Sequence, residues 1–85
     1  MSYAVFLHPK VVKFLRKLPK NDVSRIKTRL NDLRESYSVK AVKLSGSDVY
    51  RIRVGDYRVL YTIDDSKRVV VVFKIDKRER VYDRL

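Results

Sequence analysis

The stretch Tyr50-Arg51-Ile52-Arg53-Val54-Gly55-Asp56-Tyr57-Arg58-Val59-Leu60-Tyr61 decides the fold, because its alternation around Gly-Asp is typical of a β-hairpin. With Gly-Asp as a two-residue loop, Arg53 lies opposite Arg58 across the two strands. Side chains alternate between the faces of a strand, so Arg51, Arg53 and Arg58 share one face. We call these three residues the arginine face. Like charges placed directly opposite each other destabilise a sheet, and the pattern therefore indicates a surface that holds an anion such as phosphate.

The composition favours one folded domain with an anionic partner. The chain has 85 residues, of which 45% are hydrophobic, enough for a modest core but not for two. We therefore expect a single domain over residues 1–85. Lys and Arg number 21 against 10 Asp and Glu, a formal net charge of +11. Such a charge density favours nucleic acid as the partner, with a membrane surface or an acidic protein as alternatives.

Several classes of site and location are disfavoured by what the sequence lacks. It has no cysteine, which excludes disulfides and thiolate metal sites and favours a reducing cytoplasm. The single histidine, His8, cannot build a metal site alone, so we expect neither metal nor cofactor. No signal peptide and no apolar run of membrane-spanning length is present, and we expect no membrane association.

The N-terminal part predicts a strand followed by two helices. Tyr3 to Leu7 alternates as a short strand, and Pro9 suits the first position of a helix. Apolar residues then recur at helical spacing, which predicts a first helix ending at Pro19 and a second capped by Asn21 or Asp22. The apolar stripes are Val11, Phe14, Leu15 and Leu18 in the first helix, and Val23, Ile26, Leu30 and Leu33 in the second.

The C-terminal part predicts three antiparallel strands. Lys43-Leu44 indicates a possible short extra strand, the hairpin follows, and residues 68–75 form an apolar strand expected to be buried on both faces. Continuing the register through a turn at residues 64–67 places Phe73 beside Arg58. The fold class is α+β, an N-terminal strand, a helical hairpin and three antiparallel strands, with the helices on one sheet face. The arginine face is then open.

The hairpin motif, the valine-rich strand after it and the tail Lys77-Arg-Glu-Arg-Val-Tyr82 together resemble the RelE family of toxins. This family lies within the RelE/ParE superfamily of type II toxin–antitoxin systems. The opening helix Val-Val-Lys-Phe-Leu-Arg-Lys-Leu-Pro is also similar to the family's, so the resemblance covers nearly the whole chain. The Lys-Arg-x-Arg…Tyr tail is more specific to the RNA-cleaving branch.

The resemblance implies a cytoplasmic endoribonuclease that cuts mRNA in the ribosomal A site, inhibits translation and is restrained by a RelB-like antitoxin. It implies a reaction without metal, in which the ribose 2′-OH attacks the adjacent phosphate and leaves 2′,3′-cyclic phosphate and 5′-OH ends. An acidic, partly disordered antitoxin suits a basic toxin, and Val11 or Leu33 on the helical hairpin are candidate docking points.

The family's functional positions fall on five residues of this chain. The two basic hairpin positions fall on Arg51 and Arg53, and the arginine that contacts the scissile phosphate falls on Arg58. The arginine that assists the leaving group falls on Arg78, and the tyrosine that stacks on a base falls on Tyr82. The expected RNA-binding set is Arg51, Arg53, Lys74, Lys77 and Arg80.

The identity of the general base stays open. Relatives often have lysine at the positions of Arg51 and Arg53, and arginine is a poor base because it stays protonated. Either an arginine acts atypically, or Tyr82 or Lys77 takes the proton, or the ribosome orients the 2′-OH well enough without a base. Two other functions compete: a ParE-like gyrase-inhibiting toxin, and a non-catalytic basic module that binds RNA or the ribosome.

Overall fold

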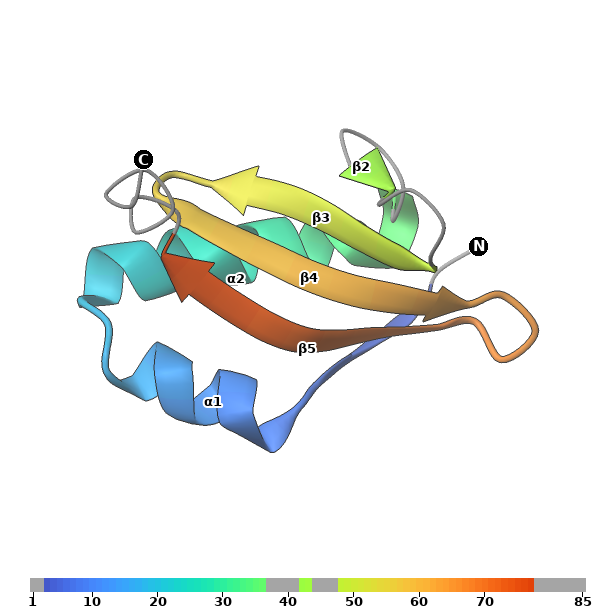
Figure 1. The fold of residues 1–85 in the computed structure, drawn as a ribbon, viewed down its shortest axis with the longest axis horizontal. Coiled ribbons are helices and arrows are strands. Elements are labelled where there is room, and N and C mark those ends of the chain that lie inside the picture. Colours follow the sequence, from blue (N-terminus) through green and yellow to red (C-terminus); the bar gives the residue numbers. More distant parts are fainter. Residues whose placement is uncertain (1–2, 37–41, 44–47, 78–85) are drawn as a thin grey trace, which may run out of the picture.

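The protein is a five-stranded sheet with two helices packed on one of its faces (Figure 1). The computed structural model describes residues 3–36, 42–43 and 48–77. The elements in chain order are β1 (Ala4–Leu7), α1 (Pro9–Arg16), α2 (Lys20–Ser36), β2 (Val42–Lys43), β3 (Val49–Val54), β4 (Tyr57–Asp64) and β5 (Val69–Lys77). The predicted α+β class, with helices on one face, is confirmed.

The strands lie in the order β1-β5-β4-β3-β2. β3, β4 and β5 form the predicted antiparallel meander, and β2 adds a two-residue strand beyond β3. The short extra strand was predicted at Lys43-Leu44; it begins one residue earlier, at Val42, and Leu44 lies outside the described residues. β1 pairs in parallel with β5, which the sequence pattern did not indicate. The α1–α2 hairpin between β1 and β5 is the crossover that a parallel pair requires.

The β3–β4 hairpin has the predicted register. Arg53 pairs with Arg58, Val54 with Tyr57, and Gly55-Asp56 forms the two-residue turn. Gly55 has φ +58°, a conformation that glycine adopts without the steric penalty of a side chain. The turn chemistry therefore fixes which side chains share a face.

The core lies between the sheet and the helices. One face of β3, β4 and β5 supplies apolar side chains that pack against the stripes of α1 and α2. Tyr50 stacks on the buried Tyr61. The buried residues are Val11, Leu15, Ile26, Leu30, Leu33, Ile52, Val54, Tyr57, Val59, Tyr61, Val70, Val72 and Ile75.

The helix ends differ from the prediction by a few residues. α1 stops at Arg16 rather than Pro19, since a residue before proline disfavours helical backbone angles and the helix must end earlier. α2 begins at Lys20, before the predicted caps, and the Val23 amide donates to the Pro19 carbonyl. His8 caps α1, and its Nδ1 accepts a hydrogen bond from the Lys10 amide at 3.0 Å.

The predicted neighbour of Arg58 was wrong. Asp76, not Phe73, pairs with Arg58. The turn between β4 and β5 extends through Arg68, whose φ is +54°, and this moves the register. In addition, Leu60 pairs with Lys74 while Tyr61 pairs with Val72, so Phe73 is the extra residue of a β-bulge.

Two burial expectations were also wrong. Val11 and Leu33 are only 1% and 3% exposed, because they face the sheet, so neither is available on the helical surface as a docking point. β5 is covered by helices on one face alone, and Val71 and Phe73 are half-buried on the other. The exposed large apolar side chain in the described part is Phe6 of β1, 56% accessible. No helix in the described ranges is long and apolar enough to cross a membrane.

Candidate functional site

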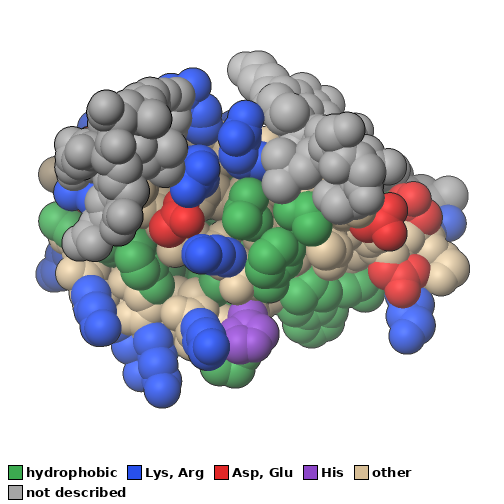
Figure 2. Space-filling view, viewed as in Figure 1, with side chains coloured by type: hydrophobic (Ala, Val, Ile, Leu, Met, Phe, Trp, Pro, Cys, Tyr) green, Lys and Arg blue, Asp and Glu red, His purple; other side chains and the backbone are tan. Residues whose placement is uncertain are grey.

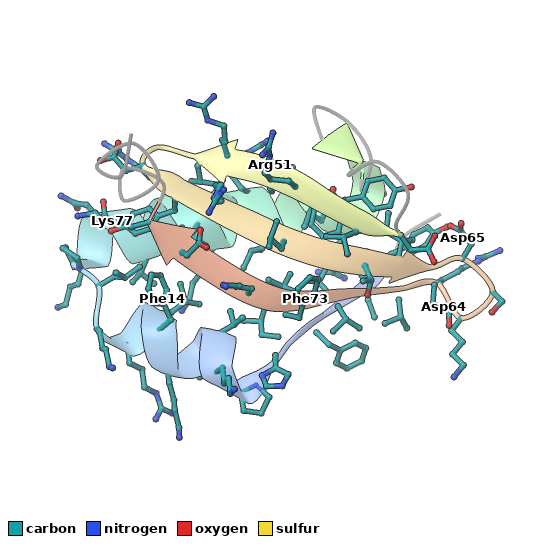
Figure 3. All side chains as sticks on the ribbon, in the orientation of Figure 1. Phe14, Arg51, Asp64, Asp65, Phe73 and Lys77 are labelled. Atoms are coloured by element: carbon teal, nitrogen blue, oxygen red, sulfur yellow. The ribbon has the colours of Figure 1, made fainter. Side chains whose placement is uncertain are left out.

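The arginine face lies on the sheet surface that the helices leave open. Arg51 and Arg53 lie on β3 and Arg58 lies on β4, directly opposite Arg53. Arg51 is labelled in Figure 3. The like-charged pair of Arg53 and Arg58 is present as predicted. The space-filling view shows Lys and Arg side chains gathered near this end, with apolar side chains over the middle of the same surface (Figure 2).

Arg58 is held by Asp76 from the neighbouring strand. Its Nε donates to Oδ1 at 3.1 Å and one terminal nitrogen donates to Oδ2 at 3.2 Å. Both side chains are partly buried, with 26% of Arg58 and 30% of Asp76 exposed. Only two of the five guanidinium N–H groups are used in these bonds, so the guanidinium is oriented and still has donors for an anion.

Arg53, Arg58 and Asp76 thus form one row across three adjacent strands. The carboxylate relieves the repulsion that the two arginines would otherwise impose on the sheet. The hairpin alone indicated a bound anion such as phosphate, whereas the structure places a carboxylate of the protein itself against Arg58. The row retains one net positive charge. Sequence reasoning missed Asp76 because the register prediction placed it away from Arg58.

The β-bulge shapes the next row. Because Phe73 is the extra residue, Leu60 lies between Arg51 on β3 and Lys74 on β5. Paired residues share a face, so Lys74 is exposed on the same side as the arginine face. The structure therefore brings four of the predicted cations together: Arg51, Arg53, Arg58 and Lys74.

The remaining predicted site residues lie elsewhere. Lys77 pairs with Tyr57, whose ring is buried against the helices, so strand alternation directs Lys77 to the opposite side from the arginine face. Figure 3 places it at the end of β5. Arg78, Arg80 and Tyr82 lie outside the described residues.

The hairpin is anchored to the helices beneath it. The Tyr57 hydroxyl donates to Oδ2 of Asp22 on α2 at 2.8 Å, and the Tyr57 ring meets Phe14 of α1 edge to face, 6.1 Å between centroids. Tyr57 directly precedes Arg58. The contact therefore fixes the strand that carries the central arginine to a rigid base.

Tyr61 is a structural tyrosine. It is fully buried, and the pKa of its hydroxyl is raised to about 12, chiefly by burial, with a further contribution from Tyr50 opposed by Arg29. It stays neutral at physiological pH. Across the described segments, no three His, Cys, Asp or Glu side chains gather where they could hold a metal ion.

The chain is similar to toxins of toxin–antitoxin systems. Residues 5–82 match a family described as "ParE toxin of type II toxin-antitoxin system, parDE". Among curated proteins, the putative toxin RelE1 of Methanocaldococcus jannaschii is 34% identical, over 96% of this chain and 97% of the relative. The mRNA interferase toxin RelE of Escherichia coli is 35% identical, over 94% and 87%.

The fold is similar to that of a solved toxin in complex. The structure of the archaeal RelE–RelB complex from Pyrococcus horikoshii OT3 contains a chain that superposes with a TM-score of 0.86 at 34% identity. The match covers 94% of this chain and 99% of that one. It therefore includes both helices and the sheet that carries the arginine face.

Proposed function

Because the chain belongs to the RelE family within the RelE/ParE toxin superfamily, we propose that it is a ribosome-dependent endoribonuclease that cleaves mRNA in the A site. A relative carries the name mRNA interferase toxin, which supports RNA cleavage as the activity. The observation that carries the proposal is Arg58: oriented by Asp76, flanked by Arg53, and with guanidinium donors left for a phosphate.

The arginine face suits the charge that RNA cleavage develops. Attack of the 2′-OH on the adjacent phosphate gives a phosphorane with extra negative charge on its equatorial oxygens. Guanidinium groups in fixed positions bind such oxygens through paired hydrogen bonds, and donors that need no reorganisation stabilise a transition state best. Arg58 and Arg53 would bind these oxygens, with Arg51 and Lys74 along the neighbouring backbone. The products would be 2′,3′-cyclic phosphate and 5′-OH ends.

The tail supplies the rest of the proposed site. Arg78 would assist the leaving 5′-oxygen and Tyr82 would stack on a base, with Lys77 and Arg80 as further RNA contacts. These roles follow from the family resemblance. The reaction as proposed uses no metal, so activity should persist in EDTA at ionic conditions that keep ribosomes intact.

Dependence on the ribosome follows from what the open face provides. It is a shallow surface with cations, and it supplies few contacts to align a flexible RNA strand. Correct alignment of a nucleophile is worth several orders of magnitude in rate. We therefore propose that the ribosome positions the 2′-OH and that free mRNA is cut slowly. The site of action would be the cytoplasm.

The test is to map mRNA ends in a translation extract. Wild type should produce new ends in A-site codons, and Arg58→Ala should lower the cleavage rate by about 100-fold or more, as loss of one preorganised transition-state donor does. Arg78→Ala should also lower it. Arg16→Ala, which removes an exposed arginine from α1 on the helical side, is the matched control. Absence of new ends with folded wild type would refute the proposal.

A ParE-like activity is the second candidate, because the matching family is described by that name. Gyrase supercoiling assays with the same preparations decide between the two. A toxin that inhibits gyrase and leaves translating mRNA intact would belong to that branch. A non-catalytic module would bind ribosomes in an Arg58-dependent way and produce no cut ends.

We also propose a RelB-like antitoxin as partner, since a solved relative is in complex with RelB. A net charge of +11 favours an acidic partner. Because Val11 and Leu33 are buried, the partner would contact the open sheet surface and its edge near Phe6 rather than those positions. Coexpression of a RelB-like antitoxin should relieve growth arrest, and its binding should protect Phe6 from solvent.

A further inference from the structure

The arginine face binds phosphate well but has no proton acceptor among its own members. Arginine remains protonated at any pH at which the protein is folded, so Arg51, Arg53 and Arg58 can stabilise charge but cannot take a proton from a 2′-OH. Lys77 is directed to the other side of the sheet. A general base for the proposed reaction would therefore be a residue outside the arginine face.

Asp76 is the carboxylate that lies against this face. Its two oxygens accept one hydrogen bond each from Arg58, at 3.1 and 3.2 Å. A carboxylate has about four lone-pair sites, so roughly two remain for a further donor. Its side chain is 30% exposed, which leaves it open to a substrate lying on the sheet.

We propose that Asp76 is the general base of this toxin, accepting the proton of the attacking 2′-OH while Arg58 binds the scissile phosphate. The inference rests on the proposed ribonuclease function. Because one guanidinium touches both the carboxylate and the phosphate, the base lies next to the nucleophile whenever the phosphate is bound. The pair thus supplies in one contact the two functions that arginine alone cannot combine.

The step balances without a further reactant. The 2′ O–H bond breaks, its proton passes to an Asp76 oxygen, and the oxygen electron pair forms the bond to phosphorus. The bond from phosphorus to the 5′-oxygen then breaks, and the leaving oxygen takes a proton from water or from the tail. Asp76 returns its proton to solvent. No atom is oxidised or reduced.

The charged groups near Asp76 are mainly cations. Arg58 on β4 contacts it, Arg53 on β3 lies beyond, and Lys74 precedes it by two residues on the same face of β5. Lys10 of α1 lines a hollow together with Lys74 at the edge of β5.

The alternative role for Asp76 is only to orient or to shield Arg58. The two roles predict different kinetics. Loss of an orienting or shielding contact changes the rate by a constant factor at every pH. Loss of a general base leaves proton removal to hydroxide, and the residual rate then rises about tenfold per pH unit.

The experiment is single-turnover cleavage on programmed ribosomes with wild type, Asp76→Asn and Asp76→Glu, between about pH 6 and pH 8.5. Asparagine keeps a hydrogen-bond acceptor for Arg58 but is not basic. Asp32→Asn on α2 removes the carboxylate partner of Arg29 on the helical side and serves as the matched control. Thermal unfolding checks each variant, and ribosome affinity is measured separately.

We expect Asp76→Asn to lower cleavage by about 100- to 10,000-fold, with a log rate that rises linearly with pH, while wild type is flat. Ribosome affinity should be unchanged or a few-fold tighter, because a negative charge beside the arginines is gone, and Asp76→Glu should regain part of the rate. A flat profile for Asp76→Asn, or a rate within about threefold of wild type, would overturn the base assignment and leave the ribonuclease proposal standing. Wild type that cuts nothing would overturn both.

Discussion

The Tyr57 hydroxyl donates a 2.8 Å hydrogen bond to the Asp22 carboxylate, joining the tip of the β3–β4 hairpin to the first turn of α2. The two residues are 35 positions apart in sequence. The bond therefore joins two halves of the fold, the helical hairpin and the sheet that carries the arginine face.

Tyr57→Phe should lower the free energy of unfolding by about 1–2 kcal/mol, the lower part of the range for a hydrogen bond to a charged group, since Asp22 is only partly buried. The ring keeps its edge contact with Phe14, so packing is conserved. Urea denaturation gives the value. Tyr3→Phe is the control, because Tyr3 donates to the exposed Asp65 at 2.6 Å. An equal loss of unfolding free energy in both variants would show that the partly buried hydrogen bond stabilises the fold no more than the exposed one.

Leu33→Ala and Phe6→Ser test the correction to the surface prediction. Leu33 is 3% exposed in the core, and its truncation should cost about 2–5 kcal/mol. Phe6 is 56% exposed, and its replacement should change stability by about 0.5 kcal/mol or less. Thermal unfolding measures both. If Phe6→Ser also weakens antitoxin binding while Leu33→Ala does so only through unfolding, the apolar part of the open surface is the docking region.

The hairpin could be predicted from sequence because a two-residue turn fixes the register of the two strands. Gly55-Asp56 is short, glycine takes the positive φ, and counting outward gives every pair in β3 and β4. The β4–β5 register could not be counted in the same way. Arg68 adopts φ +54° without being glycine, and Phe73 enters a bulge that no residue type in the stretch indicates.

The same two irregularities explain why the site was only partly predictable. Arg53 and Arg58 follow from the hairpin alone, whereas the pairing of Arg58 with Asp76 depends on the turn and the bulge together. The bulge also places Lys74 on the same side of the sheet as the arginine face. Residues 69–73 are all apolar, so the sequence does not show where along the strand the alternation changes phase, and the polar residues Lys74 and Asp76 come only after the bulge.

Tyr61 should make the protein sensitive to alkali. Burial raises its pKa in the folded state to about 12 from the ordinary tyrosine value of 10.0, so the folded state holds the proton more tightly. The corresponding stability is complete below about pH 10 and is lost as pH rises toward 12, a total of about 2–3 kcal/mol. The difference in unfolding free energy between wild type and Tyr61→Phe measured across this window isolates the effect. A difference that does not change with pH would contradict it.

The salt dependence of the RNA affinity should show how many arginines contact phosphate. Each cation that neutralises a phosphate of single-stranded RNA contributes about −0.7 to the slope of log affinity against log salt concentration. Arg53→Gln and Arg58→Gln should each reduce the steepness by about 0.7, and Arg16→Gln, on the helical side, should leave it unchanged.

The salt dependence of Asp76→Asn tests how Arg58 binds phosphate. If Asp76 competes with phosphate for Arg58, the substitution raises affinity at all salt concentrations, because asparagine removes the negative charge and keeps only one of the two acceptors of Arg58. If Arg58 binds phosphate through its other N–H groups, as the proposed base requires, the slope stays that of wild type and affinity changes only a few-fold. A slope that falls in Asp76→Asn would show that Arg58 needs its partner to reach RNA at all.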